Sequence, residues 1–191
     1  MSDDDRERWN RRYRDGAYEQ RTHPSALVAE WIDRLPGGRA LDVASGAGRN
    51  ARFLNDLGYC VTALDISGVA LSRLADAPHI QVITHDLDRG LPTLDGGFDL
   101  ILKMRFLNLA LVPALIDALN PGGVLVCEVL LQGGPAEVGP AGPRFRAAPG
   151  ALRTAAQALV VMHDSEGEVI DPDGRSVNLA RLIARKPMSC L

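Results

Sequence analysis

The 191-residue sequence is 46% hydrophobic and 24% charged, which is typical of one soluble globular domain with a substantial core. A net charge of −3 argues against the broad basic surface of a nucleic-acid-binding protein, and no apolar run approaches the ~18 residues that span a bilayer. The start MSDDDRERWN is too polar for a signal peptide, and the three cysteines are widely spaced. We therefore expect a cytoplasmic protein with no metal site, no nucleic-acid partner and no membrane association.

The N-terminal region contains two helical patterns. Trp9 and Tyr13 lie four residues apart within a run of charges, which predicts a solvated helix that docks on the domain or serves as a lid. In residues 22–35, the apolar side chains share one helical stripe, and Pro24 suits a first helical turn. Residues 1–23 are thus expected to form an N-terminal cap segment.

The middle of the chain alternates apolar runs with helix-compatible stretches, a pattern typical of βαβ units on a parallel sheet. Strands are expected at 39–44, 60–66, 80–84, 98–103 and 123–131. Helices are expected at 49–57, 67–75 and 109–119, and the last of these is followed by the turn NPGG at 120–123.

The C-terminal part changes rhythm. Residues 132–150 hold five glycines and four prolines, which predicts an irregular loop, and a loop of this length is a candidate lid. The apolar runs 158–164 and 177–186 are too close together for a crossover helix and should pair as an antiparallel hairpin. The predicted fold is therefore α/β, a single-domain, seven-stranded Rossmann-like sheet that is mostly parallel, with helices on both faces.

The stretch LDVASGAGRN (41–50) places a glycine turn between the first strand and the following helix. Gly46 and Gly48 fit the G-x-G-x-x-G/A pattern, in which glycine allows a sharp turn and a close approach of the backbone to a ligand. Asp42 is a carboxylate in an otherwise apolar strand and is costly to bury without a partner. It would repel a diphosphate but suit a cationic ligand that has an ammonium group and no phosphate.

Two further acids follow the next strands. Asp65, 19 residues after Gly46, is positioned to accept from both ribose hydroxyls, because Ser67 can supply the alternative role of helix N-cap. Asp86 could accept from the adenine amine, or could be a turn residue. Acids at three successive strand ends line one crevice in such a fold, and a ligand with ribose, amine and adenine but no phosphate is S-adenosylmethionine.

The quoted motifs carry a clear resemblance. LDVASGAGRNARFLNDLGYCVTALDIS, HDL, FDLIL and LNPGGVLV are similar, in order, to motifs of class I S-adenosylmethionine-dependent methyltransferases. YEQRTHPSALV, GPRFRAAPGALR and LARLIARKP resemble segments of the small bacterial tellurite-resistance (TehB-like) group. The resemblance implies one methyltransferase domain over residues 1–191. The His-Arg pair that this group carries before its last strand is absent from GEVIDPDGRSVN, which argues against tellurite as the physiological substrate.

The same resemblance assigns the cofactor contacts. It implies that the methionine part lies against Asp42, Ala44, Gly46 and Gly48, the ribose and one adenine face against Asp65 and Ile66, the adenine edge against Asp86 and Leu87, and the methionine carboxylate or methyl group near Lys103.

Candidates for the acceptor site lie in three segments. They are Arg21 and His23 before the first packed helix, Arg105 and Phe106 after the fourth strand, and Arg144 and Arg146 in the glycine- and proline-rich loop. Paired arginines favour an anionic group, and a soft acceptor such as a thiol or reduced chalcogen needs little help from a base. We expect methyl transfer to such a small molecule and assign no catalytic residue. Two alternatives stay open, namely an NAD-dependent oxidoreductase and a non-catalytic nucleoside-binding module.

Overall fold

The protein is built on one seven-stranded sheet with the strand order β3-β2-β1-β4-β5-β7-β6. The computed structural model describes residues 3–133, 142 and 145–188. The strands are β1 (Arg39–Val43), β2 (Cys60–Asp65), β3 (Ile80–Thr84), β4 (Phe98–Met104), β5 (Leu119–Leu130), β6 (Val160–Ile170) and β7 (Ser176–Arg185). Strands β1 to β5 pair in parallel, and β7 pairs antiparallel with both β5 and β6. The predicted fold class is confirmed.

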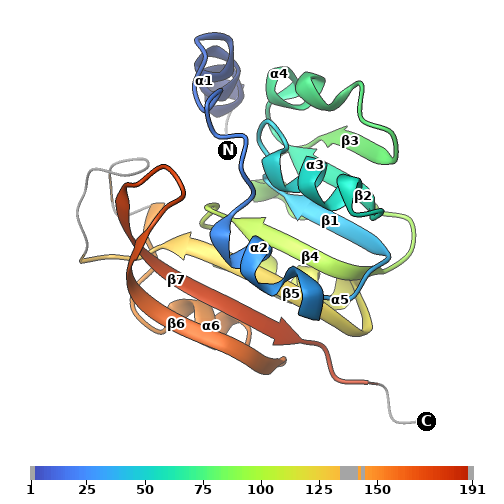
Figure 1. Ribbon diagram of the computed structural model, residues 1–191, viewed down its shortest axis with the longest axis vertical. Coiled ribbons are helices and arrows are strands. Elements are labelled where there is room, and N and C mark those ends of the chain that lie inside the picture. Colours follow the sequence, from blue (N-terminus) through green and yellow to red (C-terminus); the bar gives the residue numbers. More distant parts are fainter. Residues whose placement is uncertain (1–2, 134–141, 143–144, 189–191) are drawn as a thin grey trace.

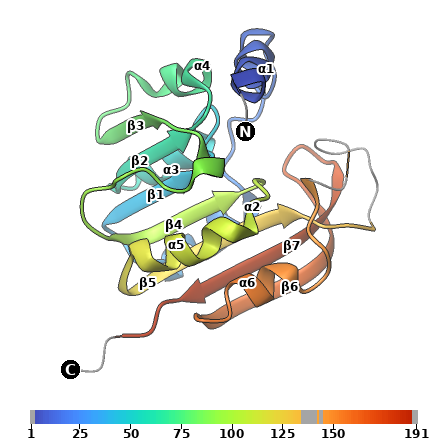
Figure 2. The ribbon, with the colours of Figure 1, turned by 180° about the vertical axis from the view of Figure 1, so that it is seen from behind.

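Helices cover both faces of this sheet (Figures 1 and 2). The α-helices are α1 (Asp3–Arg14), α2 (Ala26–Trp31), α3 (Arg49–Asp56), α4 (Gly68–Leu71), α5 (Val112–Ala118) and α6 (Ala151–Ala155), with 3₁₀ turns η1 (Ile32–Arg34), η2 (Ser72–Leu74), η3 (Leu87–Arg89) and η4 (Leu109–Leu111). Helices α2 and α3 lie in front of the sheet in Figure 1, and α5 and α6 lie in front in the reverse view of Figure 2. In the described part of the chain, no helix has the length and apolar character to cross a membrane.

Two hydrophobic cores follow from this layering. On one face, Leu115 of α5 and Leu152 of α6 pack with Ile101 of β4. On the other face, Leu27 of α2 and Leu54 of α3 pack with Leu100 and Leu102 of the same strand. Because successive side chains of a strand point to opposite faces, β4 must be apolar nearly throughout, which is why FDLILKM reads as a continuous buried strand.

The C-terminal hairpin completes the sheet. Strand β7 runs antiparallel between β5 and β6, so that Leu182 faces Cys127 on one side and Asp164 on the other. The exposure of β6 alternates along much of its length, as expected for an edge strand, whereas β7 is mostly buried. Both strands begin close to their predicted positions, and β6 continues six residues beyond its predicted end at 164.

One local prediction was wrong, and one helix was not predicted. Strand β5 begins at Leu119, so NPGG lies inside the strand; Leu119 pairs with Phe98 and Val124 with Leu100, and the register shifts between them. Close backbone packing explains this, because a Cβ on Gly123 would lie 2.9 Å from the carbonyl oxygens of Asn120 and Phe98. Helix α6 had no counterpart in the predicted elements.

Gly48 illustrates why the turn after β1 needs glycine, and a substitution there should be costly. Its φ is +81°, and a Cβ would lie 2.4 Å from a methyl of Leu74. Gly58 has a similar φ of +88° with nothing within 4 Å. We expect Gly58→Ala to lower the free energy of unfolding by about 1–2 kcal/mol through strain, and Gly48→Ala by ~1–3 kcal/mol more through overpacking. Urea unfolding measures both, and equal losses would contradict the role of Leu74.

Candidate functional site

A cavity of about 1150 Å³ lies at the carboxyl ends of the parallel strands. Its walls come from the turn after β1, the ends of β2 and β4, the N-terminal segment, and the β6–β7 turn. Ligand pockets of proteins usually measure ~300–1,000 Å³, so this cavity has room for a cofactor and a second small molecule. In a doubly wound sheet, such a crevice at the carboxyl ends is where ligands bind.

Asp42 presents a buried carboxylate to this cavity. It is the fourth residue of β1 and only 1% exposed, yet it lines the cavity wall. Its Oδ2 has no hydrogen-bond partner among the described residues, and neither has the hydroxyl of Ser45. Burial raises the pKa of Asp42 to about 7; the charge of Arg49 opposes this shift, and that of Asp65 adds to it. The wall therefore holds an acceptor that lacks its donor.

Asp65 organises the glycine turn. Its Oδ2 accepts a hydrogen bond from the Gly46 N–H at 2.8 Å, and its Oδ1 accepts one from the Ser67 N–H, also at 2.8 Å. Ala44 and Gly46 both have positive φ, at 56° and 58°, so the chain turns away from β1 within these few residues. Burial raises the pKa of Asp65, and the backbone N–H bonds partly offset that effect. Asp65, Ile66, Ala44 and Gly46 all line the cavity, as the sequence led us to expect.

The expected adenine end differs from the sequence-based assignment. Asp86 accepts from the Asp88 N–H at 3.0 Å, lies 3.6 Å from Arg89, and does not line the cavity. Its side chain caps η3, the turn-residue alternative noted above. Leu87 lines the cavity, and so do the neighbouring His85 and Asp88. The acid presented at this end is therefore Asp88, which the sequence reasoning missed because it weighed only the first acid of the loop.

Lys103 and Gly48 do not line the cavity either. Lys103 is 0% exposed, and its Nζ donates to the carbonyl of Phe106. Burial lowers the pKa of this amine, and the nearby Cys127 opposes the shift. The alternation along β4 directs Met104, rather than Lys103, into the cavity. Gly48 serves the packing of Leu74 instead.

Arg105 directly follows β4 and belongs to a buried ion-pair network. Its Nε pairs with Glu128 at the end of β5, and its Nη2 lies 2.6 Å from Oδ1 of Asp171. The backbone has a φ of +61°, and its N–H donates to the carbonyl of Glu128 at 2.7 Å. The two carboxylates raise the pKa of Arg105 against the effect of burial. The guanidinium is thus fixed in place, and it lines the cavity together with Phe106.

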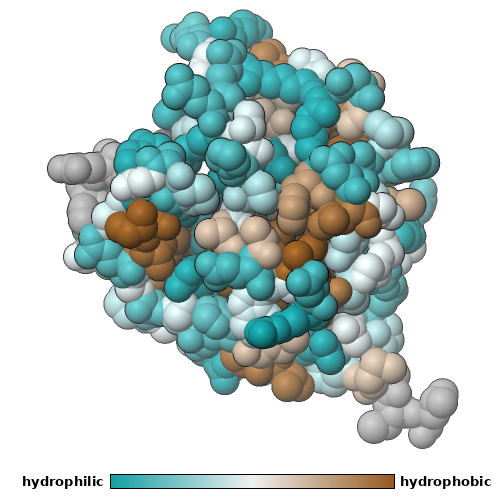
Figure 3. Space-filling model, in the orientation of Figure 1, coloured by the Kyte–Doolittle hydropathy of each residue, from teal (hydrophilic) through white to brown (hydrophobic). Residues whose placement is uncertain are grey.

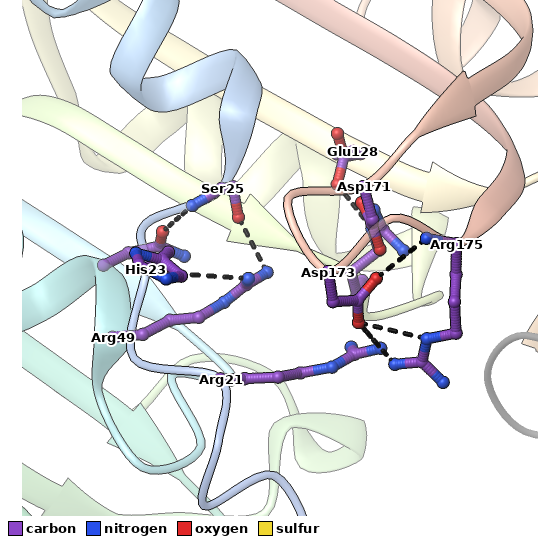
Figure 4. Close-up of polar contacts among 10 residues, drawn as sticks. Arg21, His23, Ser25, Arg49, Glu128, Asp171, Asp173 and Arg175 are labelled. Carbon is purple, nitrogen blue, oxygen red and sulfur yellow. Dashed lines mark hydrogen bonds and ion pairs between the residues drawn. The ribbon is translucent and has the colours of Figure 1, made fainter.

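The N-terminal segment closes a second wall (Figure 4). Arg21 and Arg175 converge on the same carboxylate, since Oδ2 of Asp173 lies 3.2 Å from Nη2 of Arg21 and 2.5 Å from Nη2 of Arg175. Arg49 donates to the carbonyl of His23 at 3.4 Å. Arg21 and His23, both predicted, line the cavity. Polar contacts therefore join the segment before α2 to the start of α3 and to the β6–β7 turn.

The glycine- and proline-rich loop contributes differently from the prediction. Arg144 lies outside the described residues. Arg146 does not line the cavity, and its Nη1 donates to the carbonyl of Leu131 at 3.3 Å. Phe145, between the two arginines, does line it. Phe145, rather than Arg146, therefore belongs to the cavity wall.

Several wall residues had no site assignment from sequence, among them two arginines and two aromatic residues. Arg175 is a single arginine in an arginine-rich chain, and nothing in the sequence singles it out, whereas Arg49 directly follows Gly48 in the glycine turn and its position was not weighed. Trp9 and Tyr13 had a signal in their i, i+4 spacing, which indicated docking or a lid. Both line the cavity, and Tyr13 is only 7% exposed.

Comparison with known proteins agrees with this geometry. Residues 40–123 match the family model of a methyltransferase domain. A demethylmenaquinone methyltransferase of Renibacterium salmoninarum is 33% identical over 106 residues, which cover 52% of this chain and 44% of that protein. The chain thus aligns with less than half of this curated relative.

Solved structures share the fold. TehB from Haemophilus influenzae superposes with a TM-score of 0.69 at 21% identity, over 84% of this chain and 61% of that one. A protein solved in work on the conversion of a disulfide bond into a thioacetal group during echinomycin biosynthesis gives 0.69 at 20% identity, over 88% and 84%. The glycopeptide N-methyltransferase MtfA, solved with S-adenosylmethionine, gives 0.63 at 18% identity, over 85% and 86%. The strand order and these superpositions show that the chain shares the fold of these proteins, and residues 40–123 are similar in sequence to a methyltransferase domain.

Proposed function

We propose that this protein binds S-adenosylmethionine and transfers its methyl group to a small-molecule acceptor that is a soft or anionic nucleophile, such as a thiol or a reduced chalcogen. The observation that carries the proposal is the buried, unpartnered Oδ2 of Asp42 at the cavity wall, beside the turn that Asp65 organises. A buried carboxylate without a donor is costly, and an ammonium group supplies both the charge and the hydrogen bonds.

The residues fit the remaining parts of the cofactor. Asp65 keeps acceptor capacity for the ribose hydroxyls, because its backbone donors are the N–H groups of Gly46, Ser67 and Ile66, and a carboxylate has about four lone-pair positions. Ile66 and Leu87 provide apolar surface for an adenine ring. We assign the methionine carboxylate to Arg49 rather than to Lys103. Arg49 lines the cavity, and its positive charge acts on Asp42 by lowering the pKa of that carboxyl. When bound, the cofactor supplies a methyl group already activated on a sulfonium sulfur.

The sheet topology favours this cofactor over NAD. A classic dinucleotide-binding sheet has the strand order 3-2-1-4-5-6. Here an antiparallel β7 lies between β5 and β6. Asp42, moreover, would oppose a diphosphate at the glycine turn.

The acceptor would lie between Phe106, Phe145 and the arginines of the second wall. Phe106 and Phe145 can exclude water from the reacting atoms, and positioning of the acceptor alone could contribute ~7–11 kcal/mol to the barrier reduction. Arg105 and Arg21 would orient an anionic group of the acceptor. A thiolate or a reduced chalcogen requires no proton transfer to a protein base, so we assign no catalytic base.

The first test compares ligands. We expect S-adenosylhomocysteine to raise the melting temperature and to bind with a measurable calorimetric affinity, whereas NAD should do neither. Binding of NAD alone would instead support the oxidoreductase. Binding of S-adenosylhomocysteine without methyl transfer from labelled cofactor to any of a panel of thiols, chalcogen oxyanions, phenols and amines would support a binding module.

The second test follows from Asp42. Its folded-state pKa is raised to about 7, so the carboxylate is largely neutral at about pH 6 and ionised at about pH 8. If the ionised form holds the ammonium, affinity for S-adenosylhomocysteine should rise about tenfold over this interval. Asp42→Asn should bind more weakly and lose this pH dependence, whereas Asp117→Asn, an exposed acid on α5, should keep it. Calorimetry at several pH values decides, and a parallel profile in Asp42→Asn would refute the assignment.

The third test separates Arg49 from Lys103. At about pH 8, where Asp42 is ionised, Arg49→Ala should weaken S-adenosylhomocysteine binding at least tenfold, because a charge-assisted hydrogen bond contributes ~1.5–3 kcal/mol. Lys103→Met should leave affinity nearly unchanged and raise the free energy of unfolding, since it replaces a buried ammonium by an apolar side chain. A large loss of affinity in Lys103→Met would restore the sequence-based assignment.

A further inference from the structure

Helix α1 lies directly over the glycine turn. A Cβ built on Gly46 would be 2.5 Å from the hydroxyl oxygen of Tyr13. The phenol can approach the turn this closely only because position 46 is a glycine. Tyr13 is 7% exposed and lines the cavity. Its ring also contacts Trp9, at a centroid distance of 6.3 Å, and Tyr18, at 5.9 Å.

Polar contacts outside the cavity hold α1 in this position. The hydroxyl of Ser67 lies 2.7 Å from Oδ1 of Asn10, and Nη2 of Arg73 donates to the carbonyl of Tyr13 at 2.9 Å. Arg73 also pairs with Glu19 at 3.1 Å. Ser67 caps α4, and Arg73 belongs to η2, which follows it. Figures 1 and 2 both show α1 beside α4.

The remaining surface of α1 is polar. Its sequence DDDRERWNRRYR contains only Trp9 and Tyr13 as apolar residues, and the surface over it is largely hydrophilic in Figure 3. A helix of this composition loses little on separation from the domain, because most of its side chains are already solvated. The contacts that hold it include the buried ring of Tyr13 and the hydrogen bonds of Asn10 and of the Tyr13 carbonyl.

Tyr13 lies close to the acid that we assign to the ribose. Burial, together with the charge of Asp65, raises the pKa of the Tyr13 phenol, so the hydroxyl stays protonated and can donate. None of the described residues accepts a hydrogen bond from this hydroxyl. The hydroxyl therefore projects into the same corner of the cavity as Gly46 and Asp65.

We propose that Tyr13 is a cofactor-binding residue whose hydroxyl contacts the ribose end of the bound nucleoside, and that α1 must leave the glycine turn each time the cofactor enters or departs. The inference rests on the proposed function, because it takes Asp65 as the ribose ligand. It gives α1 two separable properties. Tyr13 contributes binding energy, and the contact between Asn10 and Ser67 sets how often the helix opens.

The two properties have different kinetic signatures. A contact that holds the lid closed in both the free and the bound protein slows association and dissociation by the same factor, and leaves Kd unchanged. A contact made with the ligand slows dissociation alone, and therefore tightens Kd. Stopped-flow measurement of the association and dissociation rate constants of S-adenosylhomocysteine distinguishes these two kinds of contact. A general change in the packing of the helix would not produce both kinetic patterns.

For Asn10→Ala we expect both rate constants to rise about fivefold, the effect of one ordinary hydrogen bond, with the same Kd. For Tyr13→Phe, which keeps the ring, we expect about fivefold faster dissociation, unchanged association and a correspondingly weaker Kd. Arg11→Ala, on the exposed face of α1, is the matched control and should alter neither rate. Unchanged rates in Asn10→Ala overturn the lid, and unchanged dissociation in Tyr13→Phe overturns the contact.

Hydrogen exchange on the unsubstituted protein provides a measurement that does not depend on any variant. The amides of residues 3–14 should exchange more slowly at saturating S-adenosylhomocysteine, and equal exchange with and without it overturns the lid. If the unsubstituted protein binds no S-adenosylhomocysteine at all, the proposed function itself fails, which is distinguishable from both other results.

Discussion

The carboxylate of Asp65 is the interaction on which the site depends. By accepting from the N–H groups of Gly46 and Ser67, it fastens the turn after β1 and the start of α4 to the end of β2. Gly46 lies 19 residues before Asp65 in the sequence and Ser67 lies 2 residues after it, and the shared carboxylate holds both backbone segments in one geometry. A hydrogen bond to a charged acceptor is stronger than an ordinary one, and here it also aligns the cavity wall.

A second buried acid makes that geometry costly without a ligand. Asp42 and Asp65 repel each other across the turn, and Asp42 has an oxygen with no donor among the described residues. Much of the cost can be relieved by protonation, which is why the pKa of Asp42 is raised to about 7. A cationic ligand would relieve it more fully. The fold thus accepts a local penalty at the place where we assign the cofactor.

The sequence predicts the sheet well because each strand of a parallel sheet must be apolar on both faces and must end in breakers. It also identifies Asp42, Gly46 and Asp65, since the chemistry of a glycine turn and of a buried acid depends on local spacing. Prediction from sequence fails where the role of a residue depends on the direction in which its side chain points. Lys103 and Met104 are neighbours on one strand, and only the alternation about the final sheet shows which one reaches the cavity. Asp86 and Asp88 differ in the same way, through a single 3₁₀ turn.

Contacts between segments that are distant in the sequence could not be predicted either. The ion pair of Arg21 and Asp173 joins residues 152 positions apart, and each is an ordinary surface residue in its own segment. The triad of Arg105, Glu128 and Asp171 unites the ends of two strands with a hairpin turn. Such pairs carry no local pattern, because the chain positions them only after the sheet has formed.

The place of β7 in the sheet has a consequence for biosynthesis. It comes after β6 in the chain, yet it lies between β5 and β6 and is the only strand that β6 pairs with in the described sheet. While a ribosome is still producing residues 176–185, the edge of β5 has no partner on that side, and β6 has none at all. A nascent chain therefore exposes an apolar strand edge until β7 emerges, the period in which pairing with other chains competes with folding. The protein should accordingly be most vulnerable to aggregation, and most dependent on chaperones, in the interval after β6 has emerged and before β7 has.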